Sequence, residues 1–158
     1  DNPMMNSRLG EDEIQLLQEV NVGIAVAGAQ GLTVAVIKEA DGKSLEAIAG
    51  ESRDKIERAQ AGRLYIHETS GGTFTLSNLG MYEIDDSTQI LNLPEAGILH
   101  FGRIVQKPAV VEGQIVVRSM MHLNLTYDHR IVDGVQAATF LRTTKRYLEN
   151  PYGLLAVC

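Results

Sequence analysis

The segment His129-Arg130-Ile131-Val132-Asp133-Gly134 reads HRIVDG and joins a long β-type pattern to a helical pattern. From Gln114 to Asp128, apolar and polar residues alternate as they do along a strand with one buried face. Asp133 then occupies the N-cap position of a predicted helix that runs to about Glu149 and ends at Asn150-Pro151. The hexapeptide therefore predicts a turn held at both ends by regular structure. The helix residues predicted to face inward are Ala138, Leu141 and Leu148.

A hairpin and a second helix are predicted upstream of this segment. Two apolar, β-branched runs, Val22 to Ala27 and Leu32 to Ile37, are joined by Gly28-Ala29-Gln30-Gly31, which is typical of a hairpin turn. Ser44 is placed to cap a helix that runs to about Gln60. These local signals need no tertiary information, because both depend on residues that are close together in the sequence.

Two further strands are predicted, at residues 73–77 and 98–105, whereas residues 1–13 show no regular pattern. The order is hairpin, helix, several strands and helix, without a repeat or a linker. We therefore expect one domain over residues 1–158, of class α+β, with a mixed, largely antiparallel sheet packed by helices.

Composition excludes several functional classes. The chain has 158 residues, a formal net charge of −6 and a mean hydropathy of −0.05, so no overall positive charge attracts nucleic acid or an anionic membrane. It contains no apolar run long enough to span a bilayer. The single cysteine, Cys158, cannot form an internal disulfide, which fits a reducing compartment. We expect neither a nucleic-acid nor a membrane partner.

The residue pattern argues against covalent and metal catalysis. Cys158 lies at the end of the sequence, away from any base, and Ser77 lies in LSNLG rather than in a GxSxG elbow. The four histidines, His67, His100, His122 and His129, do not have zinc-site spacing. The remaining possibility is direct group transfer between two substrates, in which His129 is the general base that removes a proton from a nucleophile such as a thiol. A serine hydroxyl could stabilise the oxyanion, but the pattern alone does not place Ser77 beside His129.

Each candidate residue also has an ordinary structural interpretation. Taken alone, His129 would be a turn histidine and Ser77 a plain strand residue. Asp133 is better explained as a helix cap than as a proton-transfer group. Arg130 is expected to pair with Asp133 or Asp128. The other three histidines are expected at the surface or on a sheet face.

Six segments, in this order along the chain, resemble the catalytic domain of dihydrolipoyl acyltransferases. These proteins are the core components of 2-oxo acid dehydrogenase complexes and share their fold with chloramphenicol acetyltransferase. The matching segments are NVGIAVA (21–27), GLTVAVIKEAD (31–41), GGTFTLSNLG (71–80), LPEAGILHFGRI (93–104), LTYDHRIVDG (125–134) and LENPYGLL (148–155). The resemblance implies a two-layer sandwich of the chloramphenicol acetyltransferase type.

The resemblance also implies roles for individual residues. His129 matches the histidine that takes the proton from the attacking thiol, and Ser77 the hydroxyl residue that binds the tetrahedral oxyanion. Asp133 matches a position, usually Asp and sometimes Asn, that holds the active-site loop together. Arg130, Gly134 and Asn78 are expected to support the site. Coenzyme A and the lipoyl group are substrates, and no metal is implied.

The resemblance further implies an assembly. Members of the family form homotrimers, with the histidine and the serine of one active site on neighbouring subunits, and the trimers build a larger core. The apolar segment Leu154 to Val157 looks like the tail that joins trimers. The expected partners are lipoyl domains, a 2-oxo acid decarboxylase and dihydrolipoamide dehydrogenase. The expected location is the bacterial cytoplasm or the mitochondrial matrix.

The sequence departs from the family at Ala35, where a proline is common, and at its start. The family's domain begins well before residue 1, so we expect a fragment or truncated homologue that lacks lipoyl and subunit-binding domains. Two alternatives to the acyltransferase interpretation stay open: a non-catalytic core scaffold, or an enzyme that acetylates a small hydroxylated molecule. Residues 81–92 look closer to acetyl- and mixed-specificity members than to succinyl ones.

Overall fold

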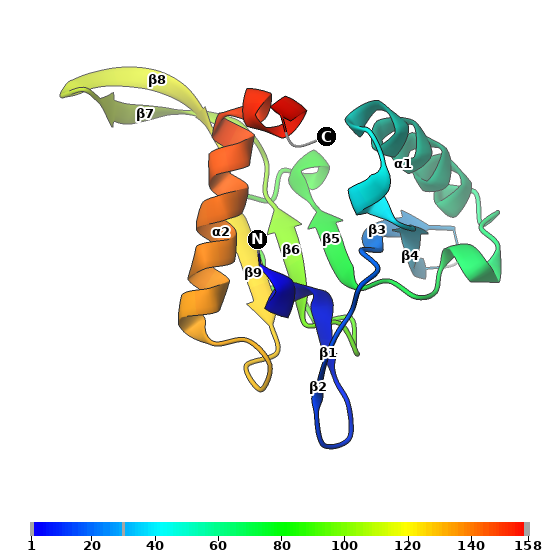
Figure 1. The fold of residues 1–158 in the computed structure, drawn as a ribbon. Helices are drawn as coiled ribbons and strands as arrows, with labels where there is room; N and C mark the ends of the chain where they lie inside the picture. Colours follow the sequence, from blue (N-terminus) through cyan, green and yellow to red (C-terminus); the bar gives the residue numbers. More distant parts are fainter. Residues whose placement is uncertain (1, 30, 157–158) are drawn as a thin grey trace.

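The computed structural model describes residues 2–29 and 31–156, and its centre is a mixed five-stranded sheet (Figure 1). The strand order is β4-β3-β5-β6-β9. The pairs β3–β4 and β6–β9 are antiparallel, whereas β3–β5 and β5–β6 are parallel. The predicted α+β class and mixed sheet are confirmed. The strands are β3 (Val22–Gly28), β4 (Gly31–Ile37), β5 (Phe74–Asn78), β6 (Gly97–Phe101) and β9 (Leu123–Tyr127).

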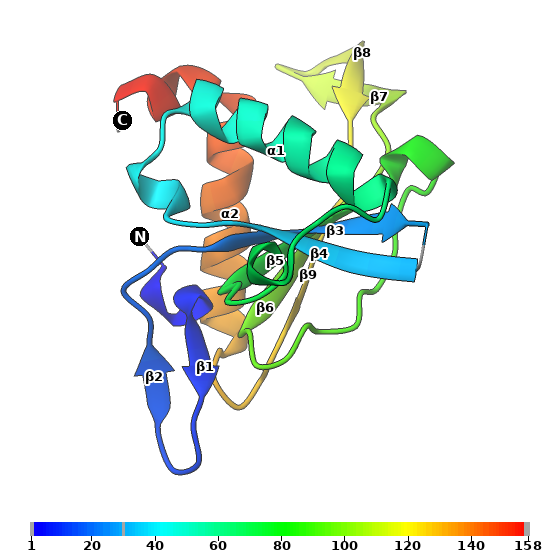
Figure 2. The ribbon, with the colours of Figure 1, turned by 90° about the vertical axis from the view of Figure 1, so that its right-hand side faces the viewer.

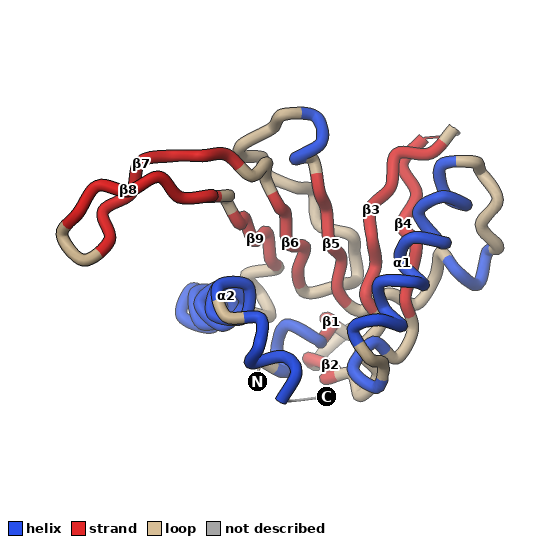
Figure 3. The backbone as a smooth tube through the Cα atoms, turned by 90° about the horizontal axis from the view of Figure 1, so that it is seen from above, coloured by secondary structure: helices blue, strands red, loops and turns tan. Residues whose placement is uncertain are grey.

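Two long helices, α1 (Leu45–Gln60) and α2 (Gly134–Glu149), lie on the same side of the sheet (Figure 3). The Oγ atom of Ser44 accepts a hydrogen bond from Ala47 N, which confirms the predicted cap of α1. Short 3₁₀ helices link the other elements: η1 (Pro3–Asn6), η2 (Ala40–Gly42), η3 (Ile66–Glu68), η4 (Gly80–Tyr82) and η5 (Pro151–Ala156). In the described ranges, no helix is both long and apolar enough to cross a membrane.

The main core lies between α2 and the sheet. Phe74 of β5, Leu99 of β6 and Ala137 of α2 are buried there, and the partly buried Phe140 packs against Phe74 in a tilted arrangement, with ring centroids 5.3 Å apart. Leu141 packs against this core as predicted. The prediction for two other α2 residues was wrong, because Ala138 is exposed and Leu148 is 46% exposed. The helix is rotated so that Ala137 faces the sheet instead.

The strand pattern after residue 97 differs from the prediction. Strand β6 ends at Phe101 rather than at Val105, and a separate strand, β7 (Val105–Val111), follows it. The predicted long strand is divided at Met121-His122 into β8 (Gln114–Met120) and β9. β7 and β8 pair with each other and project away from the five-stranded sheet (Figure 1). The alternation of apolar residues continues across the break, so periodicity could not reveal it.

The prediction that residues 1–13 lack regular structure was also wrong. After η1, β1 (Ser7–Leu9) pairs with β2 (Ile14–Leu16), and this hairpin extends below the sheet (Figure 2). Met5 and Ser7 are buried, and Met5 belongs to the main core. Only a few residues carry these contacts, which is why no sequence period marks them. The predicted tail, Leu154 to Val157, lies outside the residues whose side chains are described, as does Cys158.

Candidate functional site

The turn that carries His129 is fixed to the core on both sides of the histidine. Asp128 N donates to Ala96 O at 2.9 Å, and the amides of Ile131 and Val132 both donate to Asp128 O. Ile131 is 6% exposed and Val132 is fully buried. His129 itself is exposed, with its ring 5.5 Å from the Tyr127 ring. The turn thus presents an imidazole to solvent from a backbone that the core holds in place.

An ion pair closes the same turn. The guanidinium of Arg130 contacts the Asp128 carboxylate at 2.6 Å, and Arg130 N also donates to Asp128 Oδ1 at 3.0 Å. The hydrogen bonds from Arg130 hold the pKa of the Asp128 carboxyl below its ordinary value. Of the two partners predicted for Arg130, the structure selects Asp128. Asp128 therefore stays ionised and ties the start of the turn to its middle.

Asp133 caps α2, as the sequence predicted. Its Oδ1 atom accepts from Gln136 N at 2.8 Å, and Asp133 N donates to Gln136 Oε1 at 2.9 Å, which completes a capping box. The carboxylate is engaged by the helix and forms no pair with Arg130. Gly134 begins the helix, and a Cβ added there would meet only Tyr127 Oη, at 4.0 Å. The structural interpretation of Asp133 is confirmed.

Ser77 lies on the face of the sheet that points away from both helices. It is 6% exposed, and its hydroxyl donates to Gln89 Oε1 at 3.3 Å. Asn78 follows at the exposed end of β5, where its Oδ1 atom accepts from Gly80 N at 2.9 Å and shapes the turn. Gly80 has to be small, because an added Cβ would lie 3.0 Å from backbone atoms of Gly102 and Arg103.

The segment from Asp86 to Glu95 crosses the face that carries Ser77. It is fastened there by hydrogen bonds of its polar side chains: Asn124 Nδ2 donates to Asp86 Oδ1 and to Ser87 O, and Asn92 Nδ2 donates to Thr75 Oγ1. The structure therefore places the second half of residues 81–92, which the sequence associates with acyl specificity, on the face that carries Ser77, and Gln89 of this segment contacts Ser77.

The buried carboxyl of Glu95 accepts a hydrogen bond from Thr75 Oγ1 at 2.5 Å on the same face of the sheet. Burial raises the pKa of Glu95, although hydrogen bonds from Thr75 and Asn92 oppose the rise. Glu95 is 4% exposed, so its hydrogen bond with Thr75 is a buried contact between the covering segment and β5.

One copy of the chain does not bring Ser77 and His129 together. Strand β9 runs antiparallel to β6, so the turn after Tyr127 lies at the end of the sheet where β5 and β6 begin. Ser77 is the fourth of five residues in β5 and lies level with Asn124. At about 3.3 Å per residue, Asn124 and Tyr127 alone are separated by roughly 10 Å along the strand. Within one copy, therefore, the two side chains lie too far apart to contact the same reacting group.

His100 lies directly beside Ser77, which the sequence did not predict. The two residues are register partners on the parallel strands β5 and β6. His100 does lie on a sheet face, as expected, but it is fully buried. In the described part of the chain, neither ring nitrogen finds a hydrogen-bond partner. Burial lowers the pKa of His100, with the Asp86 carboxylate and a weak contact to the Ser77 backbone opposing, which favours the neutral ring.

His67 and His122 are exposed, and only His122 comes near the segment that covers Ser77. His67 stacks on Tyr65 in η3, and His122 lies 4.0 Å from Asp86 in the break between β8 and β9. Among the described residues, no three His, Cys, Asp or Glu side chains gather closely enough to hold a metal ion. The sequence analysis did not predict that Gln89, His100 and Asn124 lie on the same face of the sheet as Ser77.

The fold is that of the chloramphenicol acetyltransferases. A solved chloramphenicol acetyltransferase superposes with a TM-score of 0.58 over 94% of this chain and 71% of its own, at 15% identity. The chain belongs to the 2-oxoacid dehydrogenases acyltransferase (catalytic domain) family, whose model matches residues 1–156. The fold and family predicted from the six segments are thereby confirmed.

Similar proteins agree with this assignment. The succinyltransferase component of the 2-oxoglutarate dehydrogenase complex of Bartonella vinsonii subsp. berkhoffii is 44% identical over 97% of this chain and 37% of its own length. A probable dihydrolipoamide acetyltransferase from Listeria monocytogenes superposes with a TM-score of 0.89 and 39% identity, over 93% of this chain and 63% of its own. This chain thus spans less than two-fifths of that curated relative.

A third similar protein is the dihydrolipoamide acetyltransferase of Azotobacter vinelandii, with a TM-score of 0.91 and 34% identity over 97% of this chain and 64% of its own. Its structure was studied for the role of one serine, one histidine and one asparagine in the catalytic mechanism. In that enzyme the serine precedes the histidine by 52 positions, and the asparagine follows the histidine by four.

Proposed function

We propose that this chain carries the acyl-transfer site of a dihydrolipoamide acyltransferase in a 2-oxo acid dehydrogenase complex. It would move an acyl group between the thiols of dihydrolipoamide and coenzyme A. One observation carries the proposal: Ser77 precedes His129 by 52 positions and Asp133 follows it by four, the spacing of the three residues studied in the Azotobacter enzyme. Asp133 replaces the asparagine, and its carboxylate supplies the acceptor that the helix cap needs.

The geometry fits general-base chemistry without a covalent enzyme intermediate. The exposed imidazole of His129 accepts the proton of the attacking thiol, and the sulfur bonds to the carbonyl carbon of the thioester. The carbonyl oxygen becomes an oxyanion that accepts a hydrogen bond from the Ser77 hydroxyl. Collapse breaks the bond to the leaving sulfur, which takes the proton back from the imidazolium. Anchoring of the turn through Ile131 and Val132 keeps the imidazole in position.

A homotrimer would supply the second copy that the reaction needs. Ser77 and His129 lie at different ends of one sheet, so each site would pair the serine of one subunit with the histidine of its neighbour. The projecting β7–β8 hairpin supports association, because Val110, Ile115 and Val117 are 69–79% exposed on it. Contiguous exposed apolar surface of this kind is typical of protein interfaces. Trimers would then assemble into the larger core of the complex.

The acyl group and the partners are also proposals. Relatives of similar identity include succinyltransferases and the branched-chain component of Pseudomonas aeruginosa. The character of residues 81–92, which lie over Ser77, favours an acetyl or mixed acyl group. The partners would be lipoyl domains, the 2-oxo acid decarboxylase and dihydrolipoamide dehydrogenase. Because the relatives include bacterial and mitochondrial proteins, we place the chain in the bacterial cytoplasm or the mitochondrial matrix.

The first experiment measures acylation of dihydrolipoamide by acetyl- and succinyl-coenzyme A, with this chain and with His129→Ala. Removing the general base should lower kcat by about 100-fold or more. His67→Ala is the matched control, because His67 is an exposed histidine outside the site, and its activity should be unchanged. Asp133→Asn should also stay active, since asparagine can cap α2 as well.

The outcome also separates the alternatives. A parent chain with no activity towards either thioester would overturn the enzyme proposal and favour a structural core subunit. Acetylation of chloramphenicol but not of dihydrolipoamide would favour the small-molecule acetyltransferase. Equal activity of the parent chain and His129→Ala would exclude His129 as the base.

A further inference from the structure

We propose that His100 is a positioning residue for Ser77: its ring N–H donates to Ser77 Oγ and leaves the serine proton free for the oxyanion. This inference rests on the proposed function, since it assigns Ser77 a role in acyl transfer. It adds a residue outside the Ser77, His129 and Asp133 set.

The sheet register places the two side chains beside each other. Ser77 and His100 are paired on the parallel strands β5 and β6, so both point to the same face. Neighbouring strands lie about 4.8 Å apart, a distance that an imidazole can bridge towards a serine hydroxyl by rotation about its χ angles. This is the face of the sheet that the segment Asp86–Glu95 covers, opposite to the face on which α1 and α2 lie.

His100 is buried in a way that packing alone does not explain. It has no exposed surface, and in the described ranges neither ring nitrogen has a hydrogen-bond partner. A buried polar group without a partner costs stability, and an apolar side chain of similar size would avoid that cost. Such a group in a native fold calls for an explanation, and the register partner of His100 on β5 is Ser77, a proposed site residue with a hydroxyl on the same face.

The protonation of His100 fits the donor role. Burial lowers the pKa of His100, and the Asp86 carboxylate and a weak contact to the Ser77 backbone oppose this only in part, which favours the neutral ring. A neutral imidazole has one N–H donor and one bare nitrogen. The donor can serve Ser77 Oγ without bringing a buried positive charge next to the reacting carbonyl.

The bonding of Ser77 leaves room for this donor. Its hydroxyl donates to Gln89 Oε1 at 3.3 Å, which is long for an O–H donor, and the hydrogen bonds of the described residues include no side-chain donor to Ser77 Oγ. A hydroxyl oxygen can accept while its proton donates elsewhere, and the two bonds strengthen each other. When His100 donates to Ser77 Oγ, the Ser77 proton stays directed towards Gln89 Oε1, its present acceptor. During the reaction, the substrate oxyanion would replace Gln89 Oε1 as the acceptor of that proton.

A double-mutant cycle tests the proposal through activity. His100→Leu removes the donor at similar volume and should lower kcat by about tenfold, the equivalent of one neutral hydrogen bond, with KM little changed. His100→Gln, which keeps an N–H donor, should recover part of the rate. In the Ser77→Ala background, His100→Leu should have no further effect, because the two residues act as one unit. His67→Leu is the control.

The cycle separates this inference from the proposed function. If Ser77→Ala leaves kcat unchanged, the proposed oxyanion role fails, and the inference fails with it. If Ser77→Ala lowers kcat but His100→Leu does not, or if the two effects multiply, only the inference is overturned. Urea denaturation should show that His100→Leu folds, because leucine fills a similar volume, so that a lower kcat reports the lost hydrogen bond and not a loss of folding.

NMR of the ring nitrogens gives a test that does not need activity. The chain has four histidines, so the His100 imidazole can be assigned by comparison with His100→Gln. A protected ring N–H should be seen, and its signal should shift in Ser77→Ala but much less in Ser77→Thr, which keeps the hydroxyl. An unshifted signal in Ser77→Ala would mean that His100 does not bond Ser77, and the proposal would be wrong.

Discussion

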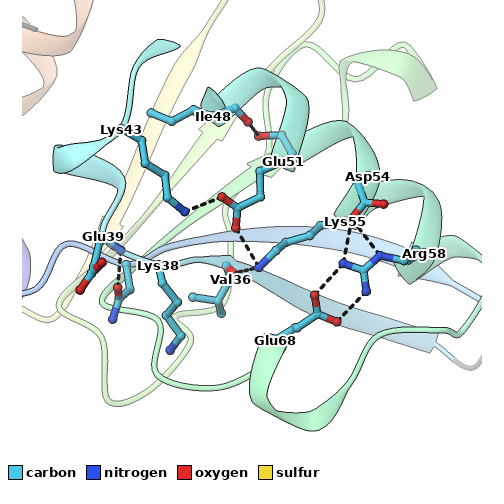
Figure 4. Close-up of polar contacts among 12 residues, drawn as sticks. Val36, Lys38, Glu39, Lys43, Ile48, Glu51, Asp54, Lys55, Arg58 and Glu68 are labelled. Atoms are coloured by element: carbon cyan, nitrogen blue, oxygen red, sulfur yellow. Dashed lines mark hydrogen bonds and ion pairs between the residues drawn. The ribbon is translucent and has the colours of Figure 1, made fainter. Parts of the chain in front are cut away.

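Helices α1 and α2 each have 16 residues and cover the same side of the sheet, but charged groups anchor the first and apolar packing the second. On α1, Lys55 is buried, and its Nζ donates to Val36 O at 2.5 Å and pairs with Glu51 at 3.1 Å (Figure 4). One turn further, the guanidinium of Arg58 makes two hydrogen bonds to Glu68 of η3. This network ties α1 to the backbone of β4.

On α2, side chains without charge make the corresponding contacts. Ala137 is buried and Phe140 packs against Phe74, while Ile131 and Val132 join the same core just before the helix. The turn with His129 is continuous with this apolar layer. The difference teaches that an apolar layer carries the turn with His129, whereas the larger charged network lies with the helix that carries none of the predicted site residues.

The largest effect on stability is expected from a substitution that leaves a cavity in the apolar core. Leu99 is 2% exposed in the middle of β6, and Leu99→Ala should reduce the free energy of unfolding by about 2–5 kcal/mol. Urea denaturation of this variant should be compared with Leu148→Ala, whose side chain is 46% exposed and should cost less than about 0.5 kcal/mol. Similar losses in both variants would contradict the claim that α2 is held by this core.

The same contrast explains what could be predicted from the sequence. The caps at Ser44 and Asp133 and the hairpin of β3 and β4 depend on neighbouring residues, so local patterns revealed them. The division of the long strand at Met121-His122 could not be seen, because alternation continues through it. Strand β7 was missed because Pro108, which cannot donate a ladder hydrogen bond, lies in its middle.

The candidate site draws on both kinds of information. The HRIVDG pattern and a resemblance that spans the chain indicate His129, Ser77 and Asp133 as candidates, and their catalytic roles stay predictions. The burial of His100 and the bond from Ser77 to Gln89 depend on which strands pair and on where Asp86–Glu95 crosses the sheet. Both depend on contacts between residues far apart in the sequence, which local periodicity does not reveal. Likewise, the separation of Ser77 from His129 follows only from the register of β5, β6 and β9.

A smaller effect is expected from breaking the charged anchor of α1. Lys55→Ala leaves the carbonyl of Val36 without its donor and deprives Glu51 of a partner, which should cost about 1–3 kcal/mol of unfolding free energy. Lys145→Ala is the control, because its pair with Glu149 on α2 is more than 60% exposed on both sides and 3.7 Å long. If the two substitutions cost the same, the buried lysine is not an anchor.

The smallest effect on stability is expected from the Arg58–Glu68 ion pair of the α1 network, and it should depend on pH. Hydrogen bonds from Arg58 lower the pKa of Glu68 from 4.5 to about 2, so the folded state binds the Glu68 proton more weakly than the unfolded state does. The stability that Glu68 contributes is therefore complete above about pH 4.5 and is lost as the pH falls towards 2. Urea denaturation of the parent and Glu68→Gln should differ at pH 6 and converge near pH 2–3, and added salt should reduce the difference. A difference that stayed constant across this range would show that Glu68 acts through packing rather than charge, and the contrast between the two helices would then rest on Lys55 alone.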